Sequence, residues 1–114
     1  MTLTIYHNPR CSKSRQTLAL LQDRGIEPRI VEYLKTPPDL ATLTKLAVTL
    51  GGARAMLRKG ESEYAELGLD DAQKSEQALL KAMHQHPILI ERPIVTDGKR
   101  AVIGRPPEAV LALL

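Results

Sequence analysis

The sequence predicts a mixed α/β fold, and three observations support this class. Residues 2–6 alternate polar and apolar side chains, which is the period of a half-buried strand. Residues 12–24 contain neither Gly nor Pro and place apolar residues at helical spacing, so they predict a helix that ends near Gly25. Residues 29–34 include Ile30, Val31 and Tyr33, residue types that favour strands, and predict a second strand. A strand, a helix and a strand in this order make a βαβ unit, whose two strands are normally parallel.

The middle of the chain, about residues 39–86, is predicted to be helical throughout. Thr36-Pro37-Pro38-Asp39 stops the second strand and offers caps for a helix that continues to Gly51-Gly52. A short helical turn is expected over residues 53–57, and a further helix over residues 75–86 that stops before a proline. We interpret this section as a helical insertion packed on a small sheet.

Sheet structure is expected again in the last quarter of the chain. Residues 88–90 either form a strand or close the preceding helix. Residues 92–96 predict a strand, Asp97-Gly98 a two-residue hairpin turn, and residues 99–103 the partner strand. A last helix follows, with proline suited to its first turn. The order β-α-β, helices, β-β-α is that of a thioredoxin-like fold, and the 114 residues form one domain with a single core.

The composition narrows the class of protein further. With 43% hydrophobic and 25% charged residues, the chain has the balance of a soluble globular protein. No stretch approaches the ~18 apolar residues of a membrane span, and the N-terminus lacks a signal-peptide pattern, so we expect a cytoplasmic protein. The net charge is only +3 and there is no Phe or Trp, which argues against a nucleic-acid surface. A small anionic substrate fits this composition better.

The only cysteine, Cys11, lies at or beside the first turn of the first predicted helix. Asn8-Pro9 breaks the preceding strand. A helix N-terminus has free N–H groups and a partial positive charge, so it stabilises an anion such as a thiolate. A lone cysteine is more often a small buried hydrophobe. Here the flanking residues are polar and cationic, which favours a reactive thiolate; they include His7, Arg10, Lys13 and Arg15.

A single cysteine limits the chemistry that the chain can perform alone. It excludes an internal disulfide and a Cys-x-x-Cys pair, and it is too few for a zinc site without other ligands. If the thiol is catalytic, the electron partner must therefore come from outside the chain.

Three arginines lie where predicted elements begin or end: Arg58, Arg92 and Arg105. Arginine binds tetrahedral oxyanions through a planar, permanently charged fork of donors. For any one of them, a surface ion pair is the simpler interpretation. Arg92 is the most suggestive, because the proline at this strand entrance of a thioredoxin-like fold is usually cis and lies against the active cysteine. We therefore hypothesise that Pro93 is cis and that Arg92 points at the thiol.

Five sequence motifs together resemble one known family. They are Tyr6-His7-Asn8-Pro9-x-Cys11-x-x-Ser14-Arg15; Tyr33-Leu34-x-Thr36-Pro37-Pro38; Leu57-Arg58-Lys59 with Tyr64-x-Glu66-Leu67-Gly68-Leu69; His86-Pro87-Ile88-Leu89-Ile90-x-Arg92-Pro93-Ile94-Val95; and Arg105-Pro106. Over nearly the whole chain, this sequence resembles the glutaredoxin-coupled arsenate reductases of the ArsC family. It is similar to the short chromosomal members, which lack the C-terminal extension of the plasmid-type enzymes.

The resemblance implies a function and a set of site residues. Cys11 would be the nucleophile, and His7 would help to lower its pKa. Arsenate would be bound by Arg58, Arg92 and Arg105, with Ser14 and Arg15 lining the anion loop. No bound cofactor or metal is implied; glutathione would be the co-substrate and glutaredoxin the partner that supplies electrons.

Two other functions fit the same scaffold. Spx-type regulators share the fold and bind RNA polymerase, but they usually have a Cys-x-x-Cys switch, and Ser14 stands here in place of its second cysteine. A glutathione-dependent thiol oxidoreductase acting on protein disulfides would need Cys11 and be indifferent to the three arginines.

Overall fold

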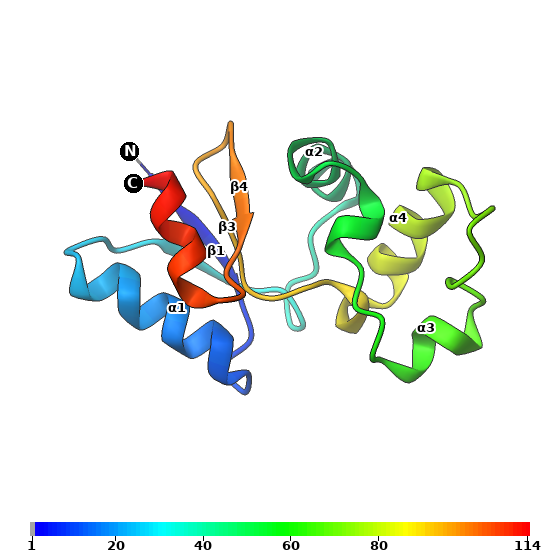
Figure 1. Cartoon of the computed structure of the whole chain (residues 1–114), viewed down its shortest axis with the longest axis horizontal. Helices are drawn as coiled ribbons and strands as arrows, with labels where there is room; N and C mark the ends of the chain where they lie inside the picture. The colour runs from blue at the N-terminus through cyan, green and yellow to red at the C-terminus, as the bar shows by residue number, and fades with distance from the viewer. Residues whose placement is uncertain (1) are drawn as a thin grey trace. The chain divides into compact units, whose positions relative to one another are not determined.

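The computed structural model describes residues 2–114 and divides them into two compact units. The first unit comprises the residues up to Thr36 together with Arg92–Leu114, and the second comprises Pro37–Glu91. The second unit covers a slightly longer stretch of sequence than the helical insertion predicted at about residues 39–86. Figure 1 shows the elements of both units.

The first unit is built on a four-stranded sheet of order β2-β1-β3-β4. Strand β1 (Thr4–His7) pairs in parallel with β2 (Arg29–Glu32), and helix α1 (Ser12–Asp23) connects them. Strand β3 (Ile94–Thr96) runs antiparallel to β1, and β4 (Ala101–Ile103) runs antiparallel to β3. This mixed α/β arrangement is that of the thioredoxin-like fold predicted from the sequence.

The core of the first unit lies between the sheet and the helices α1 and η3, a 3-10 helix over Pro107–Leu113. In β1 the side chains alternate between half-buried and buried, as the period of 2 requires. In α1 the fully buried positions follow the helical period of 3.6 residues. The buried core cluster consists of Leu3, Ile5, Leu21, Val95, Val110 and Leu113.

The turn between the last two strands differs from the prediction. The hairpin turn between β3 and β4 is longer than the two-residue Asp97-Gly98 turn predicted, because β4 begins only at Ala101. The Asp97 carboxylate accepts hydrogen bonds from the backbone N–H groups of Arg100 and Lys99, at 2.7 and 2.9 Å, which lower the pKa of Asp97 to about 2. These bonds stabilise the longer turn, so the two-residue prediction was wrong.

The second unit contains helices and one isolated strand bridge. Its elements are α2 (Leu40–Leu50), η1 (Ala53–Met56), α3 (Ser62–Glu66), α4 (Glu76–Gln85) and η2 (Pro87–Leu89). Residues 88–90 therefore close a helical segment instead of forming a strand, although Ile90 makes a single antiparallel bridge with Leu57. The Glu76 carboxylate accepts a 2.9 Å hydrogen bond from the N–H of Ala53, which ties the start of η1 to α4. Within residues 2–114, no helix is both long and apolar enough to cross a lipid bilayer.

Candidate active site

The topology of the first unit brings three distant segments to one end of the sheet. Tyr6, near the end of β1, pairs with Ile94, at the start of β3, and Ile94 in turn pairs with Ile103, at the end of β4. The residues that follow β1, precede β3 and follow β4 must therefore lie close together. These residues include Cys11, Arg92 and Arg105.

Cys11 occupies the N-cap position of α1 in a short, well-bonded loop. Its backbone N–H donates to the Asn8 carbonyl oxygen at 3.0 Å, and its own carbonyl accepts from Arg15 N–H at 3.0 Å. The Asn8 side-chain oxygen accepts a hydrogen bond from the N–H of Arg10 at 3.0 Å. The Cys11 thiol is a free cysteine of intermediate exposure, so the loop holds a sulfur that a small reagent can reach.

The surroundings of Cys11 favour its thiolate form. Burial of the sulfur raises the pKa of the Cys11 thiol, but opposing interactions outweigh burial and the net direction is downward. The lowering comes from the backbone N–H of Ser14, from the hydrogen bond and positive charge of Arg92, and from the backbone N–H of Lys13. These two N–H groups belong to the first turn of α1, whose positive end favours a negatively charged sulfur.

Arg105 completes the cationic side of the thiol. Its Nη1 lies 3.9 Å from Cys11 Sγ and donates to the Arg92 carbonyl oxygen at 3.3 Å. Cys11 and Arg105 are 94 positions apart in the sequence. The structure therefore brings together the thiol and two of the three arginines that the sequence singled out.

The Arg92–Pro93 peptide bond is cis, which confirms the hypothesis made from the sequence. The Arg105–Pro106 bond is also cis, which the sequence analysis did not predict. Both arginines adjacent to Cys11 thus immediately precede a cis proline.

His7 and Ser14 form a buried pair behind the thiol loop. His7 follows Ile5 on the buried face of β1, and Ser14 is fully buried on the face of α1 that also carries Leu21. His7 Nδ1 and Ser14 Oγ are 2.6 Å apart, and Ser14 Oγ also accepts the Asn8 N–H at 3.0 Å. Burial lowers the pKa of His7, and Arg15 lowers it further against the opposing effect of Glu32. The lowered pKa favours the neutral imidazole of His7, which is paired with Ser14.

The other two predicted site residues lie differently. Arg15 is exposed, and its Nη1 donates to the Pro9 carbonyl oxygen at 2.9 Å, so it ties α1 to the loop that precedes Cys11. Arg58 belongs to the second unit, where its Nε lies 3.3 Å from Oε1 of Glu61. Its Nη1 is buried and makes no hydrogen bond within the described residues 2–114.

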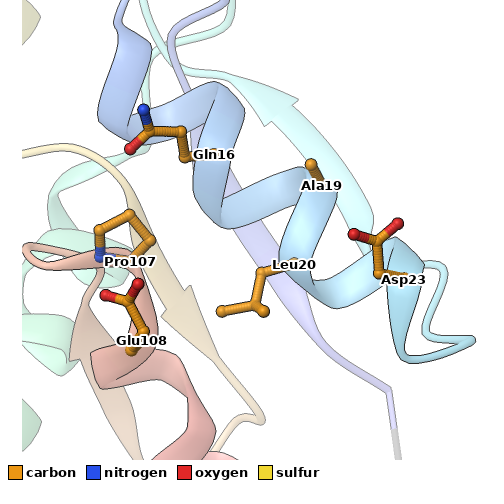
Figure 2. A pocket seen from close by; sticks show the side chains of 6 residues that line it. All are labelled: Gln16, Ala19, Leu20, Asp23, Pro107 and Glu108. Carbon is orange, nitrogen blue, oxygen red and sulfur yellow. The ribbon is translucent and has the colours of Figure 1, made fainter.

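A separate hollow of about 280 Å³ opens between α1 and the start of η3. Figure 2 shows its lining from α1, formed by Gln16, Ala19, Leu20 and Asp23, and from η3, formed by Pro107 and Glu108. Two of its six lining side chains are acidic, and the hollow contains neither the thiol nor any of the three arginines. It is therefore unsuited to an oxyanion. Nor does the described part of the chain contain a group of three or more His, Cys, Asp or Glu side chains that could hold a metal ion.

A thioredoxin-like unit with a cysteine of lowered pKa beside two arginines is typical of thiol-dependent enzymes that act on anions. The model of the ArsC family matches residues 6–113, and the chain belongs to this family. It is 49% identical over 114 residues to a Neisseria meningitidis serogroup A protein named arsenate reductase, covering 98% of this chain and 97% of that protein. It is 54% identical over 112 residues to the Escherichia coli K12 protein YfgD, described as uncharacterized, covering 96% and 94% of the two chains.

A solved structure shows the same fold. The protein described as arsenate reductase from Vibrio cholerae superposes with a TM-score of 0.96 at 52% identity, over 100% of this chain and 98% of that one. The thioredoxin-like fold predicted from the sequence is thereby confirmed.

Proposed function

We propose that this protein reduces arsenate to arsenite, with Cys11 as the attacking thiolate. The observation that supports this best is the contact of Arg105 with the sulfur, 3.9 Å from Nη1 to Sγ, beside Arg92, which lowers the pKa of the same thiol. The proposed nucleophile, Cys11, thus lies next to two arginines of the kind that bind oxyanions. Relatives at 49% and 52% identity carry the name arsenate reductase.

The arginines answer the main difficulty of the first step, which is the attack of one anion on another. The Cys11 thiolate attacks arsenic and forms a covalent sulfur–arsenic bond, while the bond from arsenic to one hydroxyl oxygen breaks. This hydroxide takes up a proton from solvent and leaves as water. Negative charge accumulates on the arsenate oxygens during this attack, and fixed guanidinium groups stabilise it. Arg92 and Arg105 supply two such groups. Arg58 is the third proposed ligand, on the resemblance of Leu57-Arg58-Lys59 to the family motif.

The electrons must come partly from another molecule. Reducing As(V) to As(III) takes two electrons, which two thiols supply when they become a disulfide. The chain has one cysteine, so at least one thiol is external. We propose glutathione as this co-substrate and glutaredoxin as the partner that removes it, in a cytoplasmic reaction that needs no bound cofactor.

A coupled assay tests the proposal. Arsenate-dependent NADPH oxidation is measured with glutathione, glutaredoxin and glutathione reductase, for the wild type, Cys11→Ser and Arg92→Ala. The matched control is Arg24→Ala, an exposed arginine at the opposite end of α1 from Cys11. We expect turnover in the wild type and the control, none in Cys11→Ser, and a loss of at least tenfold in Arg92→Ala, as for other removed transition-state donors.

Two results would contradict the proposal. Arsenate reduction retained by Cys11→Ser would remove the thiolate from the mechanism. The wild type could also show no turnover, although the glutaredoxin is competent on another substrate. This result would favour another oxyanion as substrate, a protein disulfide as substrate, or a role in binding RNA polymerase. A pull-down with polymerase subunits distinguishes the last of these.

A further inference from the structure

Gly104, the residue before Arg105, is buried in a place that leaves no room for a side chain. A Cβ atom built on it would lie 2.6 Å from Thr17 Oγ1 and 2.8 Å from Pro93 Cγ, both closer than real Cβ contacts. Its backbone does not have the positive φ that would itself require glycine. The reason for glycine here is therefore the close approach of α1 and of the Arg92–Pro93 segment.

Thr17 and Pro93 hold this glycine by hydrogen bonds as well as by contact. The Gly104 N–H donates to the Pro93 carbonyl oxygen at 2.8 Å. Thr17 is fully buried, and its Oγ1 donates to the Lys13 carbonyl oxygen at 2.8 Å and lies 3.4 Å from the Gly104 carbonyl oxygen. One hydroxyl thus links the first turn of α1, which stabilises the thiolate, to the segment that carries Arg105.

We propose that Thr17 and Gly104 are positioning residues that set the separation between the Cys11 sulfur and the Arg105 guanidinium. This inference rests on the thiolate site proposed above. Neither side chain touches the sulfur, and both act through Arg105. A methyl group at Gly104 would lie 2.6 Å from Thr17 Oγ1 and 2.8 Å from Pro93 Cγ, so one of these segments must shift. Because Arg105 is the next residue, we expect this shift to open its 3.9 Å contact with Cys11 Sγ.

The charge at the thiol can be measured without arsenate. In alkylation, the thiolate displaces iodide from iodoacetate, which is an anion, or from iodoacetamide, which is neutral. The ratio of the two rates reports the positive charge beside Cys11. Loss of one charge about 4 Å from the reacting atom should lower the ratio about fivefold in water. This is the fall that we expect for Arg105→Ala.

The variants separate positioning from general loosening of the fold. Gly104→Ala should lower the ratio by about threefold to fivefold, and it should lower it no further in an Arg105→Ala background, because interacting sites are not additive. Thr17→Val should lower the ratio at least about twofold, whereas Thr17→Ser, which retains the hydroxyl, should keep the wild-type value. The control is Thr44→Val, since Thr44 is an exposed residue of helix α2 whose hydroxyl makes the same bond to the carbonyl four residues earlier. Thermal unfolding of each variant shows that it is folded.

The outcomes are distinct for this inference and for the proposed function. Additive effects of Gly104→Ala and Arg105→Ala, or an unchanged ratio in Thr17→Val, would overturn the positioning role even if arsenate is reduced. In the converse outcome, the variants show the non-additive pattern but the wild type does not turn over arsenate. This result would uphold the positioning role and refute the substrate. If Gly104→Ala does not fold, the comparison of Thr17→Val with Thr17→Ser decides.

Discussion

Removal of the Ser14 hydroxyl deletes a single oxygen atom, but it should destabilise the protein clearly because two groups bond to that oxygen. In Ser14→Ala, His7 Nδ1 loses its partner at 2.6 Å and the Asn8 N–H loses its acceptor at 3.0 Å. Each buried polar group left without a partner costs about 1–3 kcal/mol. Asn8 is only partly buried, so its contribution belongs at the lower end, and the gain in helix propensity from alanine offsets roughly 0.5 kcal/mol. The expected loss is therefore about 2–3 kcal/mol.

Urea denaturation followed by far-UV circular dichroism measures this loss. With a slope of about 1–3 kcal/mol per molar urea, the midpoint should fall by roughly 0.7–3 M. The control is Ser12→Ala, whose serine lies exposed at the start of the same helix and should change stability by less than about 0.5 kcal/mol. A midpoint for Ser14→Ala equal to that of Ser12→Ala would refute the view that Ser14 anchors the loop.

Three further expectations concern the charges at the site. Arg92→Ala should raise the pKa of the Cys11 thiol, because Arg92 lowers it by a hydrogen bond and by its charge. A higher pKa lowers the fraction of Cys11 present as thiolate at pH 6, so iodoacetamide alkylation at this pH should slow severalfold, the greater nucleophilicity of the more basic thiolate offsetting part of the loss; an unchanged pH profile would contradict this. The lowered pKa of His7 predicts that the free energy of unfolding decreases as the pH falls below about 6.5, since the unfolded chain then binds a proton that the folded chain resists. Urea titrations at pH 7.5 and 5.5 should show this decrease in the wild type and a smaller one in His7→Gln; equal decreases would count against His7. Arg58→Ala should raise the KM for arsenate at least about tenfold without changing the alkylation profile of Cys11, and a profile that moved with KM would show that Arg58 acts on the thiol instead of on the anion.

Much of the local structure could be predicted because its causes lie within a few residues. Helix α1 begins where Asn8-Pro9 ends the strand and runs from Ser12 to Asp23, and α2 begins after the cap Asp39, whose side chain accepts the Thr42 N–H. The prediction was least accurate where competing local bonds decide the geometry, as at the turn around Asp97. The sequence analysis placed Ser14 along the anion loop without predicting that its hydroxyl lies buried against His7. The spacing of Ser14, Thr17 and Leu21 along one helix face was the signal that could have shown this.

The sequence by itself determined the chemistry that is available: one thiol, no second cysteine, and arginines at the ends of predicted elements. These are properties of residue types and near neighbours, which any chain with this order of residues possesses. Only the tertiary structure decided which arginines reach the sulfur. The antiparallel pairing of β1, β3 and β4 brings Arg105 within 3.9 Å of Cys11, although the two residues are 94 positions apart. Gly104, which immediately precedes Arg105, packs against Thr17 of α1. Distances of this kind depend on strand register and packing, because residues far apart in the sequence meet only once the sheet has formed.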